Sequence, residues 1–208
     1  MQTKRSVCMN ETKEYILKTS LMLFLQKSYK DVTMKEIVEK TGLSKGAFYH
    51  YFTSKEELYK EIVNLFFSSG AVDYSKFPKD SLLTFYNYYV EYMRLTFHKM
   101  YELVGLTDEG KVSVNFFLIM FEAIGRFPEF LKFELEQHNK DIEAWVKVIK
   151  KAKETGEIKT NSSDEQIANL FLYCTDGVFI RFVNSEQNTS YESNLLSAFD
   201  SIYNNLKE

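Results

Sequence analysis

The sequence predicts an all-α protein of about nine helices. Only 8 glycines and 2 prolines occur in 208 residues, and helices tolerate these two residue types mainly at their ends. Lys, Glu, Leu and Phe recur at helical spacing, whereas a β fold would need more turn residues. Hydrophobic residues at 45% and aromatic residues at 16% exclude a disordered chain. The length suits one sizeable domain, or a small domain that shares a core with a larger one.

Helical periodicity and capping residues define the N-terminal elements. Ile16, Ser20, Leu23 and Phe24 follow the spacing of one helix face and predict a helix over about 11–27. The stretch from Thr33 to Glu36 has the form of a capping box. It predicts that a second, short helix begins there and stops at Gly42.

The next connection is unusually short. Only Thr41, Gly42 and Leu43 separate the second helix from a third, for which Ser44 is a good N-cap. A glycine in so short a turn can take a positive φ and join two helices at a steep angle, which predicts a helix-turn-helix. A second capping box, Ser54 with Glu57, predicts the start of a fourth helix.

The rest of the chain is predicted to form longer helices, over about 54–69, 80–102, 111–126, 128–154, 163–184 and 190–207. Pro128 suits the first turn of one of them, and Gly156 suits its end. Ser162 with Glu165 is expected to cap the helix that follows.

Charge is distributed unevenly along the chain. Residues 1–60 contain 11 Lys and Arg against 7 Asp and Glu, whereas residues 61–208 contain 15 against 22. The basic N-terminal part is therefore the one suited to phosphate binding, because electrostatic attraction in salt acts over only about 10 Å. No apolar stretch of signal-peptide length follows Met1, and Cys8 and Cys174 suggest neither a disulfide framework nor a CxxC site. A cytoplasmic location, on the nucleoid when bound to DNA, is expected.

The third helix carries the heptapeptide KGAFYHY, residues 45–51, which a helical wheel divides into two faces. The packing face is predicted to hold Ala47, Phe48 and Tyr51. The outer face presents Lys45, Gly46, Tyr49 and His50, and this set suits a DNA groove. Lys45, Tyr49 and His50 can bond phosphates or base edges, and Gly46 permits close approach of the backbone. A similar face on an arbitrary surface helix is usually only solvated; here the short capped turn and the local positive charge favour DNA binding.

Residues 23–59, LFLQKSYKDVTMKEIVEKTGLSKGAFYHYFTSKEELY, closely resemble the DNA-binding domain of TetR-family transcriptional regulators. The resemblance implies a repressor that binds a palindromic operator as a homodimer and is released by a small-molecule effector. It implies a DNA-binding domain over 1–55 and an effector-binding and dimerisation domain over 56–208, bridged by the helix 54–69. The residues that it implies at the DNA are Thr33, Ser44, Lys45, Gly46, Tyr49, His50 and Lys55. Ser28 departs from the glycine that is common in the family, and would cost about 1 kcal/mol in a left-handed conformation.

The C-terminal part is rich in aromatic residues on more than one helical stripe. Most such residues simply pack in a core or an interface. The hypothesis beyond this is an effector pocket for a largely apolar or aromatic molecule, formed by the predicted helices 80–102, 111–126 and 128–154. Its candidate lining residues are Tyr89, Tyr92, Phe117, Met120, Phe121 and Trp145.

The last two helices are apolar on several sides and are predicted to pair with those of a second copy as a four-helix bundle. The candidate interface residues are Phe171, Cys174, Val178, Phe179, Phe182, Leu195, Phe199 and Ile202. His98 and His138 lack metal-ligand spacing, so no metal or other cofactor is expected. A small-molecule sensor or carrier without DNA binding is the main alternative function. An all-helical enzyme is a weaker one, because no acid–base or nucleophile motif is present.

Overall fold

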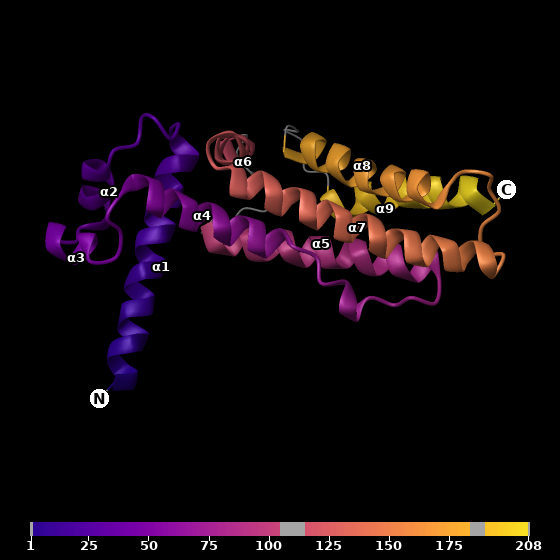
Figure 1. Ribbon diagram of the computed structural model, residues 1–208, viewed down its shortest axis with the longest axis horizontal. Helices are drawn as coiled ribbons and strands as arrows, with labels where there is room; N and C mark the ends of the chain where they lie inside the picture. The colour runs from indigo at the N-terminus through magenta and orange to yellow at the C-terminus, as the bar shows by residue number, and fades with distance from the viewer. Residues whose placement is uncertain (1, 105–114, 184–189, 208) are drawn as a thin grey trace. The chain divides into compact units, whose positions relative to one another are not determined.

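The computed structural model describes residues 2–104, 115–183 and 190–207, and all regular structure in these ranges is helical. The helices are α1 (Gln2–Gln26), α2 (Met34–Thr41), α3 (Lys45–Tyr49), α4 (Lys55–Gly70), α5 (Leu82–Val104), α6 (Asn115–Arg126), α7 (Pro128–Glu154), α8 (Asp164–Val183) and α9 (Tyr191–Lys207), with a 3-10 turn η1 (Tyr74–Lys76) before α5 (Figure 1). The predicted all-α class is confirmed. No described helix is long and apolar enough to cross a membrane.

The chain packs as two compact units. The first unit comprises residues 1–69 and 100–131, and the second comprises residues 70–99 and 132–208. The domain division predicted near residue 55 concerns function rather than packing, and it stays a prediction.

Helix ends follow local chemistry, with differences from the predictions at the start of α1 and at the cap of α8. Gly42 ends α2 with φ 67° and Gly156 follows α7 with φ 73°, and in the described ranges no residue other than glycine has a positive φ. Ser28 therefore carries no left-handed strain. Helix α1 begins at Gln2 rather than near residue 11, because residues 2–10 include neither Gly nor Pro to stop it.

The cap of α8 lies one residue later than predicted. Ser163 Oγ accepts a hydrogen bond from Gln166 N at 3.1 Å, and Ser163 N donates to Gln166 Oε1 at 2.9 Å. Gln166 can close this reciprocal box as well as a glutamate can. The expectation for Ser162 and Glu165 was therefore wrong, since Ser162 lies before the cap.

The core of the first unit joins α1, α2 and α3 to α4 and α6. Ile16, Phe24, Ile37, Phe48, Phe52, Leu58 and Ile62 are among its buried side chains. Tyr59 on α4 is 1% exposed, packs edge-on against Phe24, and donates a hydrogen bond to Ile119 O of α6 at 2.9 Å. Burial raises the pKa of this phenol. Helix α6 is thereby fixed to the base of the N-terminal helices.

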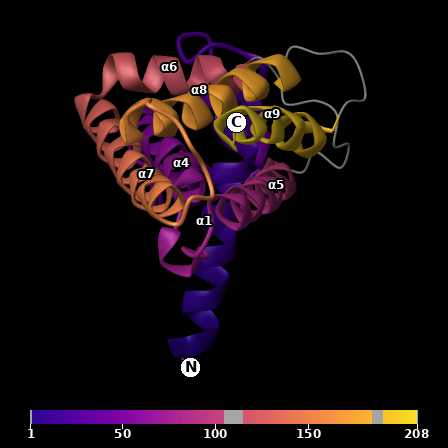
Figure 2. The ribbon, with the colours of Figure 1, turned by 90° about the vertical axis from the view of Figure 1, so that its right-hand side faces the viewer.

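In the second unit, α5, α7, α8 and α9 lie side by side around an aromatic core (Figure 2). The Trp145 ring stacks on Phe171 at 4.8 Å and meets Phe85, Tyr89 and Phe199 edge-on at 5.0–5.7 Å. Such pairs add about 0.5–1.5 kcal/mol each beyond the burial of their area. The expectation that most of the aromatic residues pack in a core is met for these five.

Candidate nucleic-acid interface

Helices α2 and α3 and the turn between them are built by local hydrogen bonds. Thr33 Oγ1 accepts from Glu36 N and Ser44 Oγ accepts from Ala47 N, both at 3.2 Å, which caps each helix. Gly42 N closes the end of α2 on Glu39 O at 3.2 Å. The second half of the predicted Thr33 box is absent, because the Glu36 carboxylate pairs instead with Lys27. The predicted helix-turn-helix is thus formed by residues close in the chain.

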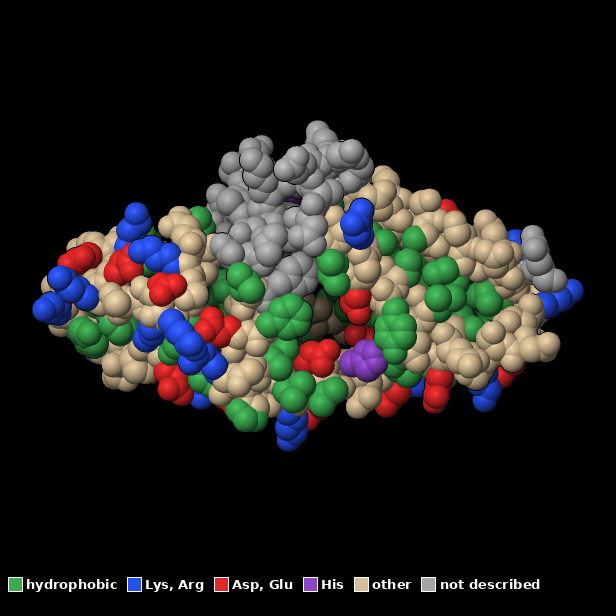
Figure 3. Space-filling view, turned by 90° about the horizontal axis from the view of Figure 1, so that it is seen from above, with side chains coloured by type: hydrophobic (Ala, Val, Ile, Leu, Met, Phe, Trp, Pro, Cys, Tyr) green, Lys and Arg blue, Asp and Glu red, His purple; other side chains and the backbone are tan. Residues whose placement is uncertain are grey.

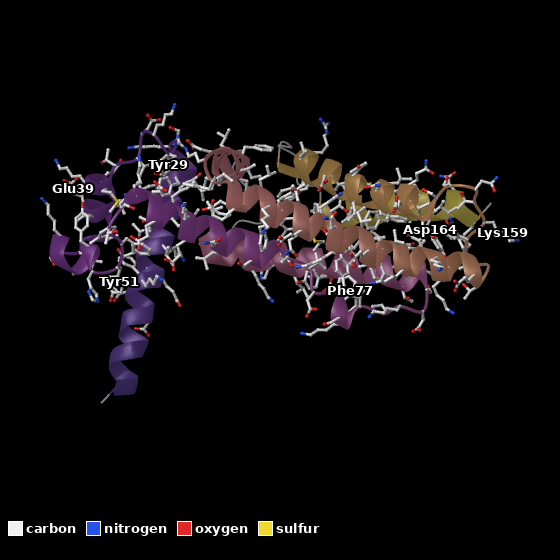
Figure 4. All side chains as sticks on the ribbon, in the orientation of Figure 1. Tyr29, Glu39, Tyr51, Phe77, Lys159 and Asp164 are labelled. Atoms are coloured by element: carbon white, nitrogen blue, oxygen red, sulfur yellow. The ribbon has the colours of Figure 1, made fainter. Side chains whose placement is uncertain are left out.

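Helix α3 buries one side and leaves the other open. Phe48 and Phe52 are fully buried with ring centroids 6.5 Å apart, whereas Lys45, Gly46, Tyr49 and His50 are exposed. Ala47 is also exposed, contrary to its predicted place on the packing face. The buried side is centred on the two phenylalanines, and Ala47 lies about 120° away from that centre. Tyr51, labelled in Figure 4, is only partly buried.

Lys55 lies at the start of α4, and its ammonium is already bound within the protein. Its Nζ donates to Tyr29 O and Val32 O at 2.7 Å each and lies 4.2 Å from the centre of the Tyr29 ring. Desolvation, with the charge of Arg126, lowers the pKa of this lysine. Two of the three N–H donors of this ammonium group therefore hold the loop before α2. A contact of Lys55 with DNA remains a prediction from the sequence.

Tyr29 is a residue that the sequence did not single out. Its ring lies between two cations, with Arg126 4.5 Å from the ring centre in addition to Lys55, and its backbone N donates to Glu122 Oε2 at 3.2 Å. Glu122 and Arg126 belong to α6. No local pattern could have revealed these contacts, because the partners lie more than ninety residues apart in the chain.

Several basic side chains of the first unit are left for a partner. Lys13, Lys27 and Lys35 form ion pairs with carboxylates of the chain. Within the described part of residues 1–60, four lysines have no ion pair or internal hydrogen bond: Lys18, Lys30, Lys40 and Lys45. Three of the four lie within the helix-turn-helix or the loop before it, where they can meet phosphates.

The residues predicted for an effector pocket are divided between the units. Tyr89 and Trp145 are buried in the second unit, where Tyr92 donates its hydroxyl to Ala71 O at 3.2 Å. Met120 and Phe121 lie on α6 in the first unit, with Phe121 67% exposed. The side chain of Phe117 lies outside the described residues. This pocket therefore stays a prediction.

The second unit has a separate cavity of about 370 Å³, which no predicted pocket residue lines. Its walls come from η1, the start of α5 and one face of α7: Val72, Tyr74, Ser75, Lys79, Phe85, Lys140, Glu143, Ala144, Lys147 and Val148. Among the described His, Cys, Asp and Glu side chains, no group of three is placed to hold a metal ion.

The predicted dimer residues fall into two sets. Phe171, Leu195 and Phe199 are fully buried in the core of the chain itself, whereas Cys174, Val178, Phe179, Phe182 and Ile202 are partly buried. A different stripe of α8 is open: Leu170, Tyr173 and Ile180 are 49%, 62% and 48% exposed, and Gly177 lies between them. The predicted interface stays a prediction, and these exposed apolar side chains form a second candidate surface on α8 among the described residues.

Comparison with known proteins agrees with this geometry. Residues 16–62 match the model of the bacterial regulatory proteins of the tetR family. The chain is 54% identical over 50 residues to the uncharacterized HTH-type transcriptional regulator YerO of Bacillus subtilis, over 24% of this chain and 17% of that protein. It is 36% identical over 76 residues to the HTH-type transcriptional regulator AcrR of Shigella flexneri, over 35% of each protein. The matches thus span between 17% and 35% of the length of these curated relatives.

The fold of the whole chain is similar to that of solved regulators. Salmonella enterica GusR superposes with a TM-score of 0.58 at 21% identity, over 95% of this chain and 96% of that one. A second structure, described as a TetR/AcrR family member, gives a TM-score of 0.59 at 18% identity, over 96% and 100% of the two chains. Residues 16–62 therefore match the tetR family of bacterial regulatory proteins, and the fold of the chain is similar to that of these solved regulators.

Proposed function

We propose that this protein is a DNA-binding transcriptional repressor that binds a palindromic operator as a homodimer and is released by a small-molecule effector. The observation that carries the proposal is the open face of α3, where Lys45, Gly46, Tyr49 and His50 stand outside a helix anchored by two buried phenylalanines. The family consists of regulators, so no catalytic role is proposed.

The face of α3 suits contact with DNA. The lysine and the phenol can bond phosphates or base edges, and the N-terminus of a helix attracts phosphate. The helix is only five residues long, which suffices to reach a few base pairs. Two copies in successive major grooves lie about 34–36 Å apart and require a palindromic site.

The dimer is proposed to form through α8 and α9. The exposed side chains of Leu170 and Tyr173 on α8 are largely apolar and would be covered by a second copy. Gly177 has no side chain, and the space beside it is open in the single chain, since a Cβ placed there would meet no atom within 4 Å. A helix of a second copy could therefore approach closely at this position.

Release by an effector requires two states of the dimer that differ in the separation of the two α3 helices. An effector that binds the wider state more tightly lowers operator affinity by its differential affinity, commonly about 1–3 kcal/mol. In the first unit, the contacts of Tyr29 with Glu122 and Arg126 connect α6 to the loop before α2. This connection is a route by which α6 could move the helix-turn-helix.

Selection of bound DNA from a random pool tests the proposal. A palindrome should be recovered, and the Tyr49→Ala and Lys45→Ala proteins should bind it more weakly than the original protein in a mobility-shift assay while unfolding at the same temperature. Gln26→Ala, an exposed position at the end of α1, is the matched control.

Recovery of no sequence, or equal affinity in both variants, would instead favour the alternative of a small-molecule sensor or carrier that does not bind DNA. The recovered site, located in the source genome, would also identify the regulated genes.

A further inference from the structure

The cavity in the second unit has a lining whose polarity follows its exposure. Its volume of about 370 Å³ lies within the range of about 300–1,000 Å³ that small-molecule sites occupy. The buried and partly buried lining residues form an apolar floor: Val72, Tyr74, Phe85, Ala144 and Val148. The exposed lining residues are all polar or charged: Ser75, Lys79, Lys140, Glu143 and Lys147. An apolar floor with a charged rim suits a molecule that has an apolar body and a charged group.

One wall of the cavity is a single face of α7. The five lining residues that α7 contributes follow the spacing of one helical face: Lys140, Glu143, Ala144, Lys147 and Val148. Ala144 lies between the two lysines, which are about 10 Å apart along the helix axis. Its methyl group is the smallest side chain of this face, so α7 leaves room for a ligand between two positive charges.

The other wall, formed by η1 and its flanking residues, is held by contacts with α5. Tyr92 of α5 donates its hydroxyl hydrogen to Ala71 O at 3.2 Å and accepts a hydrogen bond from Asp73 N at 3.4 Å. Phe77, labelled in Figure 4, is 4% exposed, and its ring centre lies 5.3 Å from that of Phe85. Since the segment is anchored on both sides of η1, the cavity is formed before any ligand binds.

The rim of the cavity carries positive charge that the chain does not neutralise. Among the described residues, Lys79 and Lys140 form no ion pair and no hydrogen bond. Lys147 pairs with Glu143 at 3.9 Å, but their side chains are 77% and 71% exposed, and such pairs contribute little. The lining therefore holds three cations against one carboxylate.

The surroundings of the cavity have the opposite charge. Residues 70–99 and 132–208, which form the second unit, contain 13 Lys and Arg against 16 Asp and Glu. Acidic side chains also gather around the histidine visible in Figure 3. The cavity is thus a basic site in an acidic unit, and its local field favours an anion.

Resting on the function proposed above, we infer that this cavity is the effector site and that the effector is an organic anion with an aromatic body. The body would lie against Tyr74 and Phe85, whose rings are parallel with centres 6.0 Å apart, and the anionic group would be bound by the rim lysines. Lysine ammonium groups are point charges with rotating donors, so they suit a carboxylate or a similar small anion. The predicted apolar or aromatic effector thereby gains a charge and a location.

The probe is naphthoate, a carboxylate on two fused rings, titrated into the full-length protein by calorimetry. Neutral naphthamide and cationic naphthylmethylammonium have the same ring system and are the comparison ligands. The double variant Lys79→Gln/Lys140→Gln removes two rim charges, and Ala144→Leu fills the cavity. Lys150→Gln, which changes an exposed α7 lysine outside the lining, is the matched control.

Naphthoate is expected to bind, with naphthamide at least about tenfold weaker and the ammonium compound weaker still. The double lysine variant should lose at least about fivefold in affinity for naphthoate and little for naphthamide. Ala144→Leu should weaken both at least about tenfold, because the larger side chain occupies the cavity, and Lys150→Gln should match the original protein. Equal binding of naphthoate and naphthamide, unchanged affinity in the double lysine variant or in Ala144→Leu, or no binding of naphthoate would overturn the inference.

Circular dichroism on each variant checks folding, which the replacements of exposed lysines should preserve. A mobility-shift assay without ligand measures DNA binding separately, and saturating naphthoate should then weaken operator binding at least about fivefold. Operator binding that bound naphthoate does not change would overturn the assignment of the effector site. DNA binding without naphthoate binding would reject only the cavity as a site. Naphthoate binding without DNA binding would reject the proposed regulator and leave the cavity supported as a site for anions.

Discussion

Lys45 and Lys55 each begin a helix of the first unit, but the chain uses them differently. The Lys45 side chain is exposed and has no internal partner among the described residues, whereas the Lys55 ammonium holds the carbonyls of Tyr29 and Val32. Sequence position alone suggested a DNA contact for both. The difference arises because the loop before α2 folds back onto α4 and brings its carbonyls within reach of only one lysine.

Lys55→Ala is therefore expected to lower the free energy of unfolding by about 2 kcal/mol, because it leaves two partly buried carbonyl groups without their charged donor. Lys45→Ala should change it by no more than about 0.5 kcal/mol. Urea unfolding followed by circular dichroism measures both. Equal stability of the two variants would contradict the structural role of Lys55.

Gly46 offers a cleaner test of the DNA-facing surface. A Cβ at this position would meet no atom within 4 Å, so Gly46→Ala should keep or raise stability, by up to about 1 kcal/mol through helix propensity. The added methyl group should nevertheless weaken binding to the selected operator if the α3 backbone approaches the DNA. A mobility-shift titration decides this, and unchanged affinity would place the backbone farther from the DNA.

Asp141 should make stability depend on pH. Burial raises its pKa from 3.8 to about 6, with Tyr74 of η1, His138 and Glu134 of α7 and Asp176 of α8 as its charged or titratable neighbours. The native state thus holds this proton more tightly than the unfolded chain, so the contribution of Asp141 to stability falls as pH rises from about 4 to about 6.

Asp141→Asn is expected to be about 1–2 kcal/mol more stable than the original protein at pH 7, and this advantage should vanish near about pH 3, where the carboxyl is largely protonated in both states. Thermal unfolding at the two pH values measures the difference. An advantage that does not change with pH would mean that removal of the charge is not its cause.

Among the elements, α5 depends on a residue far away in the sequence. Glu157, in the loop after α7, accepts hydrogen bonds from Leu82 N and Leu83 N at 3.0 Å, and from Ser81 Oγ and Tyr203 Oη at 3.1 Å. Burial by itself would raise the pKa of this carboxyl, but the hydrogen bonds outweigh it and the pKa is lowered. One carboxylate therefore caps α5 and ties it to α9.

Glu157→Ala should cost about 1–3 kcal/mol at pH 7, since it leaves the first N–H groups of α5 without an acceptor. Because the native pKa is lowered, the contribution of Glu157 is present above the ordinary value of 4.5 and is lost as pH falls through the native pKa. The variant and the original protein should converge in acid. Glu154→Ala, an exposed position at the end of α7, is the control and should have little effect.

Helix ends were largely predictable, and helix contacts were not. Thr33, Ser44 and Ser54 cap their helices as their spacing indicates, and Gly42 takes the positive φ of the turn. Each of these capping hydrogen bonds joins residues three positions apart. Ser163, rather than Ser162, is the N-cap of α8. Either serine has a suitable Glu or Gln three residues later, so the local sequence does not distinguish them, and the residue at which α8 begins decides which one is the cap.

At the scale of the whole molecule, the exposed stripe of α8 leads to a prediction about assembly. Tyr173→Glu would place a charge at the centre of the proposed interface and is expected to give monomers in sedimentation velocity at micromolar concentration, with the fold retained because Tyr173 is 62% exposed. Leu83→Glu, which changes an exposed leucine of α5, should leave the dimer intact. Dimers in both variants would place the interface elsewhere.

The sequence by itself determined the helical class, the helix-turn-helix and the division of α3 into a buried and an open face, because these depend on residues within a few positions of one another. Only the tertiary structure decided that Lys55 is bound internally, that Phe171, Leu195 and Phe199 fill the core of one chain, and that Asp141 lies among Tyr74, Trp145 and Asp176. These outcomes depend on which distant helices pack together. Periodicity indicates that a helix has an apolar face, but it does not indicate which partner covers that face.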